Sequence, residues 1–133
     1  MDFGFTNDKE RYDAAIAYKD SAIADGWSLK TEENGNCDYF ILNREGFTMH
    51  CMARLHKSTC KWKYQAEVTI WGPDGLQIRV PDMYDWEEIQ KRVDVCMSCG
   101  AVGKIQRVGF AGRYCSKCVP AQRKIQEFPG WTN

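Results

Sequence analysis

The sequence predicts an α+β protein, with an N-terminal helix, an antiparallel sheet of about four strands and a second helix, followed by a small four-cysteine module. Three observations predict this order. Apolar residues recur at helical spacing near the start, apolar and polar residues then alternate as in strands, and two cysteine pairs occupy the last quarter. The 133 residues suit one domain, or one domain with a small module.

The composition indicates a folded protein with a hydrophobic core. Hydrophobic residues make up 44% of the chain and aromatic residues 13%, which excludes a disordered chain. No stretch approaches the roughly 20 apolar residues that a membrane span needs. The start, MDFGFTNDKER, lacks the apolar segment of a secretory signal. We therefore expect a cytoplasmic protein without membrane contact, whose cysteines are thiols or metal ligands rather than disulfides.

The N-terminal helix is predicted over residues 7–25. Asn7 or Asp8 is a suitable N-cap, and Gly26 stands where a helix commonly ends. We expect one side of this helix to pack on the sheet. The predicted stripe consists of Tyr12, Ala15, Ile16, Lys19, Ala22 and Ile23.

Strand patterns follow the helix. Residues 27–33 are a weak candidate and residues 36–45 a better one, with a turn at Gly46. Residues 46–57 and 61–71 alternate with a period of two, which predicts strands with one buried and one solvated face. The residues predicted on the buried face are Phe47, Met49, Cys51, Ala53 and Leu55, then Trp62, Tyr64, Ala66, Val68 and Ile70.

A turn at 72–75 and renewed alternation at 76–80 predict a hairpin over residues 61–80, which Pro81 ends. A short helix is predicted over 85–93, because Asp85 can cap it, with Glu88 three residues later as in a capping box. Its buried side would carry Trp86, Ile89 and Val93. The acidic residues near its start, Asp82, Asp85, Glu87 and Glu88, fit cap and helix-dipole partners better than metal ligands.

The charge distribution divides the chain near Val95. Residues 1–95 hold twelve basic and seventeen acidic side chains, a balance of −5, whereas residues 96–133 hold six basic side chains and one acidic one, a balance of +5. We therefore predict an α+β domain over 1–95 and a basic zinc module over 96–133.

The cysteines of the module follow the pattern C-x2-C-x15-C-x2-C, which is typical of zinc sites. The predicted ligands of one structural Zn²⁺ are Cys96, Cys99, Cys115 and Cys118. A rubredoxin-like iron site or a redox dithiol is the alternative. Four cysteines leave no open position for water, and neither H-x-E nor H-E-x-x-H is present, so we expect no enzyme activity at this site.

The module resembles a treble-clef finger of the four-cysteine kind. CMSCG is similar to a zinc knuckle, residues 101–114 to a hairpin, and residues 115–128 to a helix with Pro120 in its first turn. The resemblance implies that this helix supplies the last two ligands from its first turn. A zinc ribbon, the alternative, usually has a second knuckle followed by glycine, where this chain has Val119 and Pro120. Treble-clef fingers bind DNA, RNA, proteins or nothing, so the resemblance implies no function.

The sequence leaves two binding functions as alternatives. The acidic residues 1–95 favour a protein-interaction module that regulates or inhibits a basic partner, such as a nucleic-acid enzyme. The basic module alternatively favours nucleic-acid binding, although the overall pI of 6.7 is low for a dedicated binder. The candidate contact residues are Lys104, Arg107, Phe110, Arg113, Tyr114, Lys117, Arg123 and Lys124.

Residues suited to catalysis or to a second metal also occur in the first 95 residues. An enzyme would have to use His50, His56 or one of Cys37, Cys51 and Cys60. His50, His56 and Cys60 share strand parity and could bind a metal, but a buried Cys51 and solvated histidines are the simpler interpretation. The solvated face could also form a basic patch, although Glu67 favours an ordinary surface. That patch would consist of Arg54, Lys61, Lys63, His50 and His56.

Overall fold

The computed structural model describes residues 7–30, 38–58, 61–109 and 112–126. Its elements are α1 (Asp8–Ala24), β1 (Ser28–Lys30), β2 (Tyr39–Arg44), β3 (Phe47–Ser58), β4 (Lys61–Trp71), β5 (Gln77–Ile78), α2 (Trp86–Lys91), the 3-10 turn η1 (Arg92–Asp94), β6 (Ile105–Val108), β7 (Gly112–Cys115) and α3 (Val119–Gln126). Among the helices described, none has the length and apolar character to cross a membrane.

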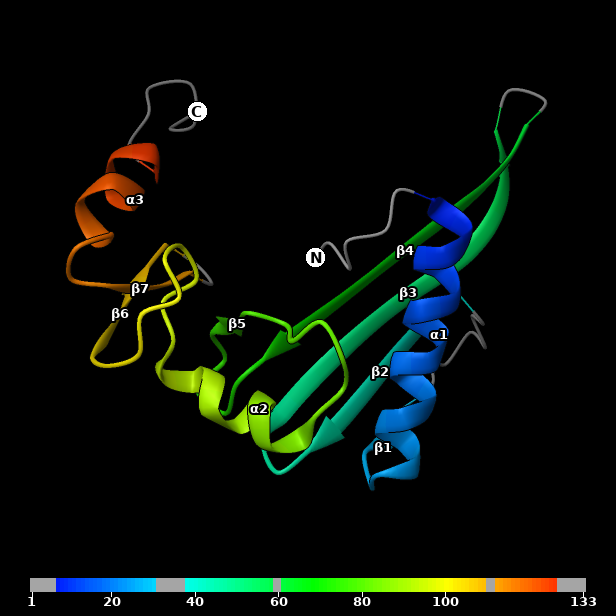
Figure 1. Cartoon of the computed structure of the whole chain (residues 1–133), viewed down its shortest axis with the longest axis horizontal. Helices are drawn as coiled ribbons and strands as arrows, with labels where there is room; N and C mark the ends of the chain where they lie inside the picture. Colours follow the sequence, from blue (N-terminus) through cyan, green and yellow to red (C-terminus); the bar gives the residue numbers. More distant parts are fainter. Residues whose placement is uncertain (1–6, 31–37, 59–60, 110–111, 127–133) are drawn as a thin grey trace.

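The predicted α+β class is confirmed. Strands β1 to β5 form one antiparallel sheet in sequence order, with α1 across one face, and β6 and β7 form a separate two-stranded sheet beside α3 (Figure 1). The main sheet has one strand more than expected. The predicted hairpin over 61–80 is short, because β5 pairs with β4 only at Ile70↔Ile78 and Trp71↔Gln77. The boundary near Val95 stays a prediction.

Helix α1 has the predicted caps. The Asn7 side chain accepts hydrogen bonds from the backbone N–H of Lys9 and Glu10. At the other end the N–H of Trp27 donates to the carbonyl of Ala22, and that of Gly26 to the carbonyl of Ile23. This is a Schellman motif, and it needs the positive φ of +106° that Gly26 adopts.

The packed side of α1 differs from the predicted stripe in two residues, because it includes Tyr18 and leaves out Ile23. Ala15, Tyr18 and Ala22 are buried, whereas Ile23 is 38% exposed. At 100° per residue, positions 15, 18 and 22 share one side, and Tyr12 and Ile16 pack beside them on the core, whereas Ile23 lies in the last turn of the helix. The two alanines bring the helix close to the sheet, so that the Cys51 thiol donates to the carbonyl of Ala15 at 3.4 Å.

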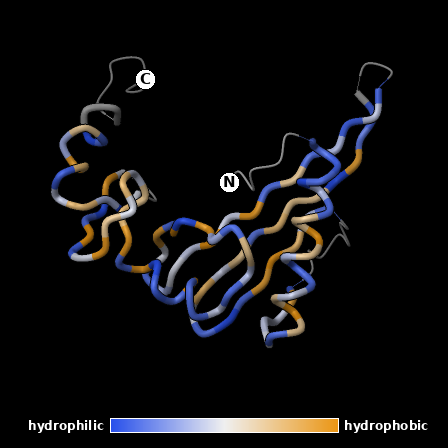
Figure 2. Tube along the Cα trace, in the orientation of Figure 1, coloured by the Kyte–Doolittle hydropathy of each residue, from blue (hydrophilic) through white to orange (hydrophobic). Residues whose placement is uncertain are grey.

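The central strands show the predicted alternation (Figure 2). A two-residue turn, in which Glu45 and Gly46 both have positive φ, sets the register of β2 on β3. The face toward α1 carries the core, including Leu42, Met49 and Ile70, and no described residue of the opposite face of β2, β3 and β4 is buried. We call this second face the open face. Leu55 and Trp62 depart from the prediction, because they lie beyond the cover of α1 and are 43% and 65% exposed.

A polar cluster holds the C-terminal end of α1 against the segment before α2. The Trp27 indole N–H donates to the Tyr84 hydroxyl at 2.9 Å, and this hydroxyl donates to the Asp25 carboxylate at 2.6 Å. Arg44 donates to the same carboxylate and stacks on Trp86. Burial, together with the hydrogen bond to Asp25, raises the pKa of Tyr84 to about 12. Helix α2 begins at its predicted cap, since Asp85 accepts from the N–H of Glu87 and Glu88.

We expect Tyr84→Phe to lower the free energy of unfolding by about 1–2 kcal/mol, since Trp27 and Asp25 each lose a hydrogen-bond partner. Because the folded pKa is raised, the contribution of the hydroxyl is present below the unfolded tyrosine pKa of about 10 and disappears as the pH rises toward the folded value. Urea unfolding of wild type and variant between pH 7 and pH 11 measures this difference. A difference that stays constant over this range contradicts the assignment. Tyr39→Phe, on the open face, is the matched control and should have no effect.

Candidate metal centre

The four predicted zinc ligands lie together. Cys96 and Cys99 belong to the loop after η1, Cys115 is the last residue of β7, and Cys118 immediately precedes α3. Their sulfur atoms all lie within 4.8 Å of one another, and the Sγ atoms of Cys99 and Cys115 are 3.6 Å apart. Two sulfurs bound to one tetrahedral zinc at about 2.3 Å would be about 3.8 Å apart. The four side chains are therefore positioned to bind one metal ion, and four thiolates would complete a tetrahedral coordination of zinc.

Both cysteine pairs hold their first sulfur in the same way. Backbone N–H groups of Ser98 and Cys99 point to the sulfur of Cys96, and those of Lys117 and Cys118 point to the sulfur of Cys115. Burial opposes ionisation of Cys96, but these N–H groups outweigh it and lower the pKa of its thiol to about 6. The N–H of Cys118, in the same way, lowers the pKa of Cys115. The loops thus stabilise thiolates, the form in which cysteine binds zinc.

The pKa of Cys118 shifts in the opposite direction to those of Cys96 and Cys115. The hydrogen bond between the sulfurs of Cys118 and Cys115, followed by burial, raises the pKa of Cys118 to about 12. Sulfurs this close together retain a proton between them, because adjacent thiolates repel each other. A divalent cation with four thiolate ligands replaces such a proton and neutralises part of the charge. The donor set therefore fits zinc.

The first loop turns tightly at Gly100. The N–H of Gly100 donates to the carbonyl of Cys96, the N–H of Cys96 donates to the carbonyl of Ala101, and Gly100 has a φ of +79°. This conformation favours glycine. A loop of this kind directs the sulfurs of Cys96 and Cys99 toward the same metal position.

The second pair leads into α3. The N–H of Cys118 donates to the carbonyl of Cys115, and the carbonyl of Cys118 accepts from the N–H of Gln122, as the first hydrogen bond of the helix. Pro120 lies in the first turn, as predicted. The expectation that both last ligands come from this first turn is wrong, since Cys115 ends β7 and Cys118 occupies the position before the helix. The pairing of Ile105 with Cys115 requires this placement.

One buried arginine attaches the metal centre to the main sheet. The Arg113 guanidinium donates to the Asp74 carboxylate, in the turn between β4 and β5, and to the carbonyl of Val93 in η1. Its backbone carbonyl accepts from the N–H of Met97, between the first two ligands. Arg113 is only 6% exposed. It therefore connects both cysteine pairs to the sheet, and no sequence pattern relates it to Asp74.

The predicted contact residues of the module fall into separate groups. Arg113 has to be removed from the set, because its guanidinium is buried and already bound by Asp74 and Val93. Tyr114 is half-buried. Phe110 and the side chain of Lys124 lie outside the described residues. The exposed members are Lys104, Arg107, Lys117 and Arg123.

The alternative of a second metal site at His50, His56 and Cys60 is not supported by the two histidines. His50 and His56 lie six residues apart on one strand, a separation of about 20 Å, too far for one ion. Cys37 and Cys60 lie outside the described residues. Cys51 is buried, and burial raises the pKa of its thiol to about 11, so it is an unreactive core residue. The cysteine cluster is the only group of three or more potential ligands found within the described ranges.

We expect Cys115→Ser to lose zinc and to loosen β6, β7 and α3 while β2 to β4 stay folded, because the module, as far as the structure describes it, has few buried apolar residues of its own. Metal analysis of the purified protein and amide hydrogen exchange measure the two effects. Cys51→Ala removes a buried thiol that is not a ligand, and this control should keep its zinc. Unchanged zinc content in Cys115→Ser contradicts the site.

We expect Asp74→Asn to destabilise the attachment of the module by on the order of 2 kcal/mol, because Arg113 loses a charged partner. The asparagine oxygen can still accept from the N–H of Leu76, as the aspartate does. Burial opposes ionisation of Asp74, but the hydrogen bonds from Arg113 and from the N–H of Leu76, together with the charge of Arg113, outweigh it and lower the pKa of Asp74. The contribution is therefore present at neutral pH and is lost in acid. Faster hydrogen exchange in β6 and β7 at pH 7, with unchanged zinc content, is the expected result. Asp82→Asn is the control, and equal exchange in both variants contradicts the link.

No family model matches this sequence, and neither the curated proteins nor the solved structures include a match. The treble-clef resemblance therefore has no relative to support it. What the metal centre does has to be argued from its own residues.

Proposed function

We propose that this chain is a non-enzymatic zinc-binding protein in which one structural Zn²⁺ fixes a treble-clef-like finger, residues 96–133, beside an α+β domain. The observation that carries this proposal is the cluster of four cysteine sulfurs within 4.8 Å. Four thiolates fill the coordination sphere, so no position is left for a water nucleophile. The zinc would act through folding, by holding a small module that lacks a large core.

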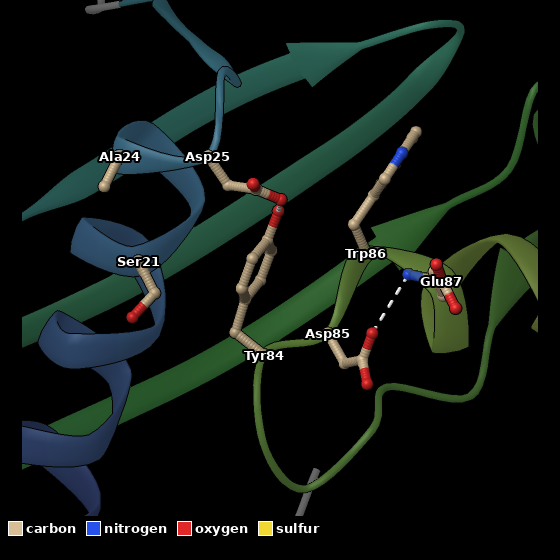
Figure 3. Close-up of a pocket in the computed structure, with 7 residues that line it drawn as sticks. All are labelled: Ser21, Ala24, Asp25, Tyr84, Asp85, Trp86 and Glu87. Carbon is tan, nitrogen blue, oxygen red and sulfur yellow. Dashed lines mark hydrogen bonds between the residues drawn. The ribbon is translucent and has the colours of Figure 1, made fainter.

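We further propose that the assembled protein is an interaction module that regulates or inhibits a protein partner. Its best-suited surface is an acidic strip where the C-terminal half of α1 meets the segment before α2. Two hollows of about 640 and 340 Å³ share Ser21 and Tyr84 along this strip, and their linings include no lysine or arginine. Figure 3 shows the larger hollow, with Asp25, Asp85 and Glu87 on its lining. Met83, in the smaller hollow, is 80% exposed.

These features support a partner with a basic surface. Carboxylates around an exposed apolar side chain are complementary to a surface that offers lysine or arginine next to an apolar pocket. A nucleic-acid enzyme has such a surface, because it binds a polyanion. An acidic module bound there would compete with the substrate.

Nucleic-acid binding through the finger is the second candidate. The exposed Lys104, Arg107, Lys117 and Arg123 favour it. The burial of Arg113 removes a central cation from that surface, so this candidate has less support.

We expect Glu87→Lys to reduce recovery of the protein partner about tenfold in pull-downs with the zinc-loaded protein, because it reverses a charge in the acidic strip. Nuclease treatment should leave the partner in place. Glu10→Lys is the matched control, since Glu10 also lies in the first turn of a helix but at the far end of α1. Partners that vanish with nuclease and are indifferent to Glu87→Lys contradict the proposal and favour nucleic-acid binding.

A further inference from the structure

Strands β3 and β4 extend beyond their neighbours as a two-stranded ribbon, away from the finger (Figure 1, upper right). β2 pairs with β3 only as far as Met52, and β5 pairs with β4 only at Ile70 and Trp71. We call residues 54–58 and 61–65 the hairpin arm. Within the described part of the chain, these residues pair only with each other.

All the charged side chains of the hairpin arm are basic. No aspartate or glutamate occurs between residues 46 and 66. The arm carries Arg54, Lys57, Lys61 and Lys63, and none of them has an ion-pair partner among the residues that the structure describes. Four cations without a carboxylate among them give the arm a positive potential, which attracts anions.

The arm also exposes a large aromatic side chain. Tyr12 of α1 packs on Tyr64, with the two ring centroids 5.1 Å apart, and α1 covers the ribbon no further than this residue. Two residues further out, Trp62 is 65% exposed and pairs with Lys57 on the same face of the ribbon. Lys61 and Lys63, its neighbours in sequence, lie on the other face. The indole thus contributes little to the core, has Lys57 beside it on its own face, and has Lys61 and Lys63 on the opposite face of the ribbon.

We propose that the hairpin arm binds single-stranded nucleic acid, with an unstacked base on Trp62 and phosphates on Lys57, Lys61 and Lys63. Aromatic side chains bind single strands by stacking, and lysines bind the backbone without sequence preference. The bases of a duplex are already stacked and cannot use the indole in this way. A membrane would need a broader apolar face than Trp62 and Leu55 provide.

This assignment revises the interpretation of the open face as an ordinary surface. Glu67, which favours that interpretation, pairs with Met52 and lies inside the main sheet rather than on the arm. The arm is also remote from the acidic strip and from the finger (Figure 1). Nucleic-acid binding by the arm therefore goes beyond the proposed protein docking and does not depend on it.

The test is fluorescence anisotropy of the full-length, zinc-loaded protein with labelled (dT)20, over a range of salt concentrations. We expect a double-logarithmic salt slope of about −2 to −3, as for three or four phosphates neutralised on a single strand. Trp62→Ala should weaken binding about 10- to 100-fold, because one base loses its stacking surface. Trp62→Phe should restore part of the loss. Lys61→Gln with Lys63→Gln should make the slope shallower by about 1.4.

Two controls separate the arm from other surfaces. Met83→Ala removes another large, highly exposed apolar side chain, and Lys104→Gln with Arg107→Gln removes two cations from the finger. Both variants should bind (dT)20 like wild type. Circular dichroism should show all variants folded, since every substituted side chain is exposed.

Four results would overturn the proposal. The first is loss of binding in the finger variant but not in the arm variants. The second is equal affinity for a 20-base-pair duplex, with no effect of Trp62→Ala. The third is competition by polyglutamate as strong as by unlabelled (dT)20, and the fourth is binding to phosphatidylserine vesicles without binding to (dT)20.

Discussion

The pairing of β3 with β4 is the constraint on which the rest of the structure depends. Its register runs without interruption from Thr48↔Trp71 to Ser58↔Lys61, and it decides which side chains meet α1 and which meet solvent. A shift of β4 by one residue against β3 would turn Val68 and Ile70 to the open face. The close approach of α1, through Ala15 and Ala22, holds this register from one side. The polar cluster around Tyr84 then places α2, and α2 leads into the metal centre.

The finger depends on two attachments of different chemistry. Four cysteines hold its loops, hairpin and helix together, and Arg113 joins that unit to Asp74 and Val93. Either attachment alone would be weak. The described part of the finger buries few apolar residues, and a buried guanidinium is stable only while its partners remain in place. The backbone carbonyl of Arg113 also accepts from the N–H of Met97 in the first cysteine loop, so one residue contacts both the metal centre and the main sheet.

Local patterns in the sequence predicted the elements and the ligands well, and contacts between distant residues poorly. The caps at Asn7, Gly26 and Asp85 and the ligand spacing depend on residues within a few positions of each other. The link from Arg113 to Asp74 spans 39 residues and leaves no periodic signal. Exposure of Leu55 and Trp62 was also beyond prediction, because alternation shows which residues share a face but not where the covering helix begins.

The free edge of β4 has a consequence for the behaviour of the protein in concentrated solution. Among the described residues, Lys61 to Thr69 pair only with β3, so their outer N–H and C=O groups are available to another extended chain. Strands exposed in this way tend to assemble edge to edge, and lysines on them oppose such assembly through charge repulsion. Lys61 and Lys63 would therefore oppose edge-to-edge assembly through β4, in addition to the phosphate binding proposed for them. Acetylation or neutralisation of these lysines would favour fibril-like aggregation, independently of any ligand.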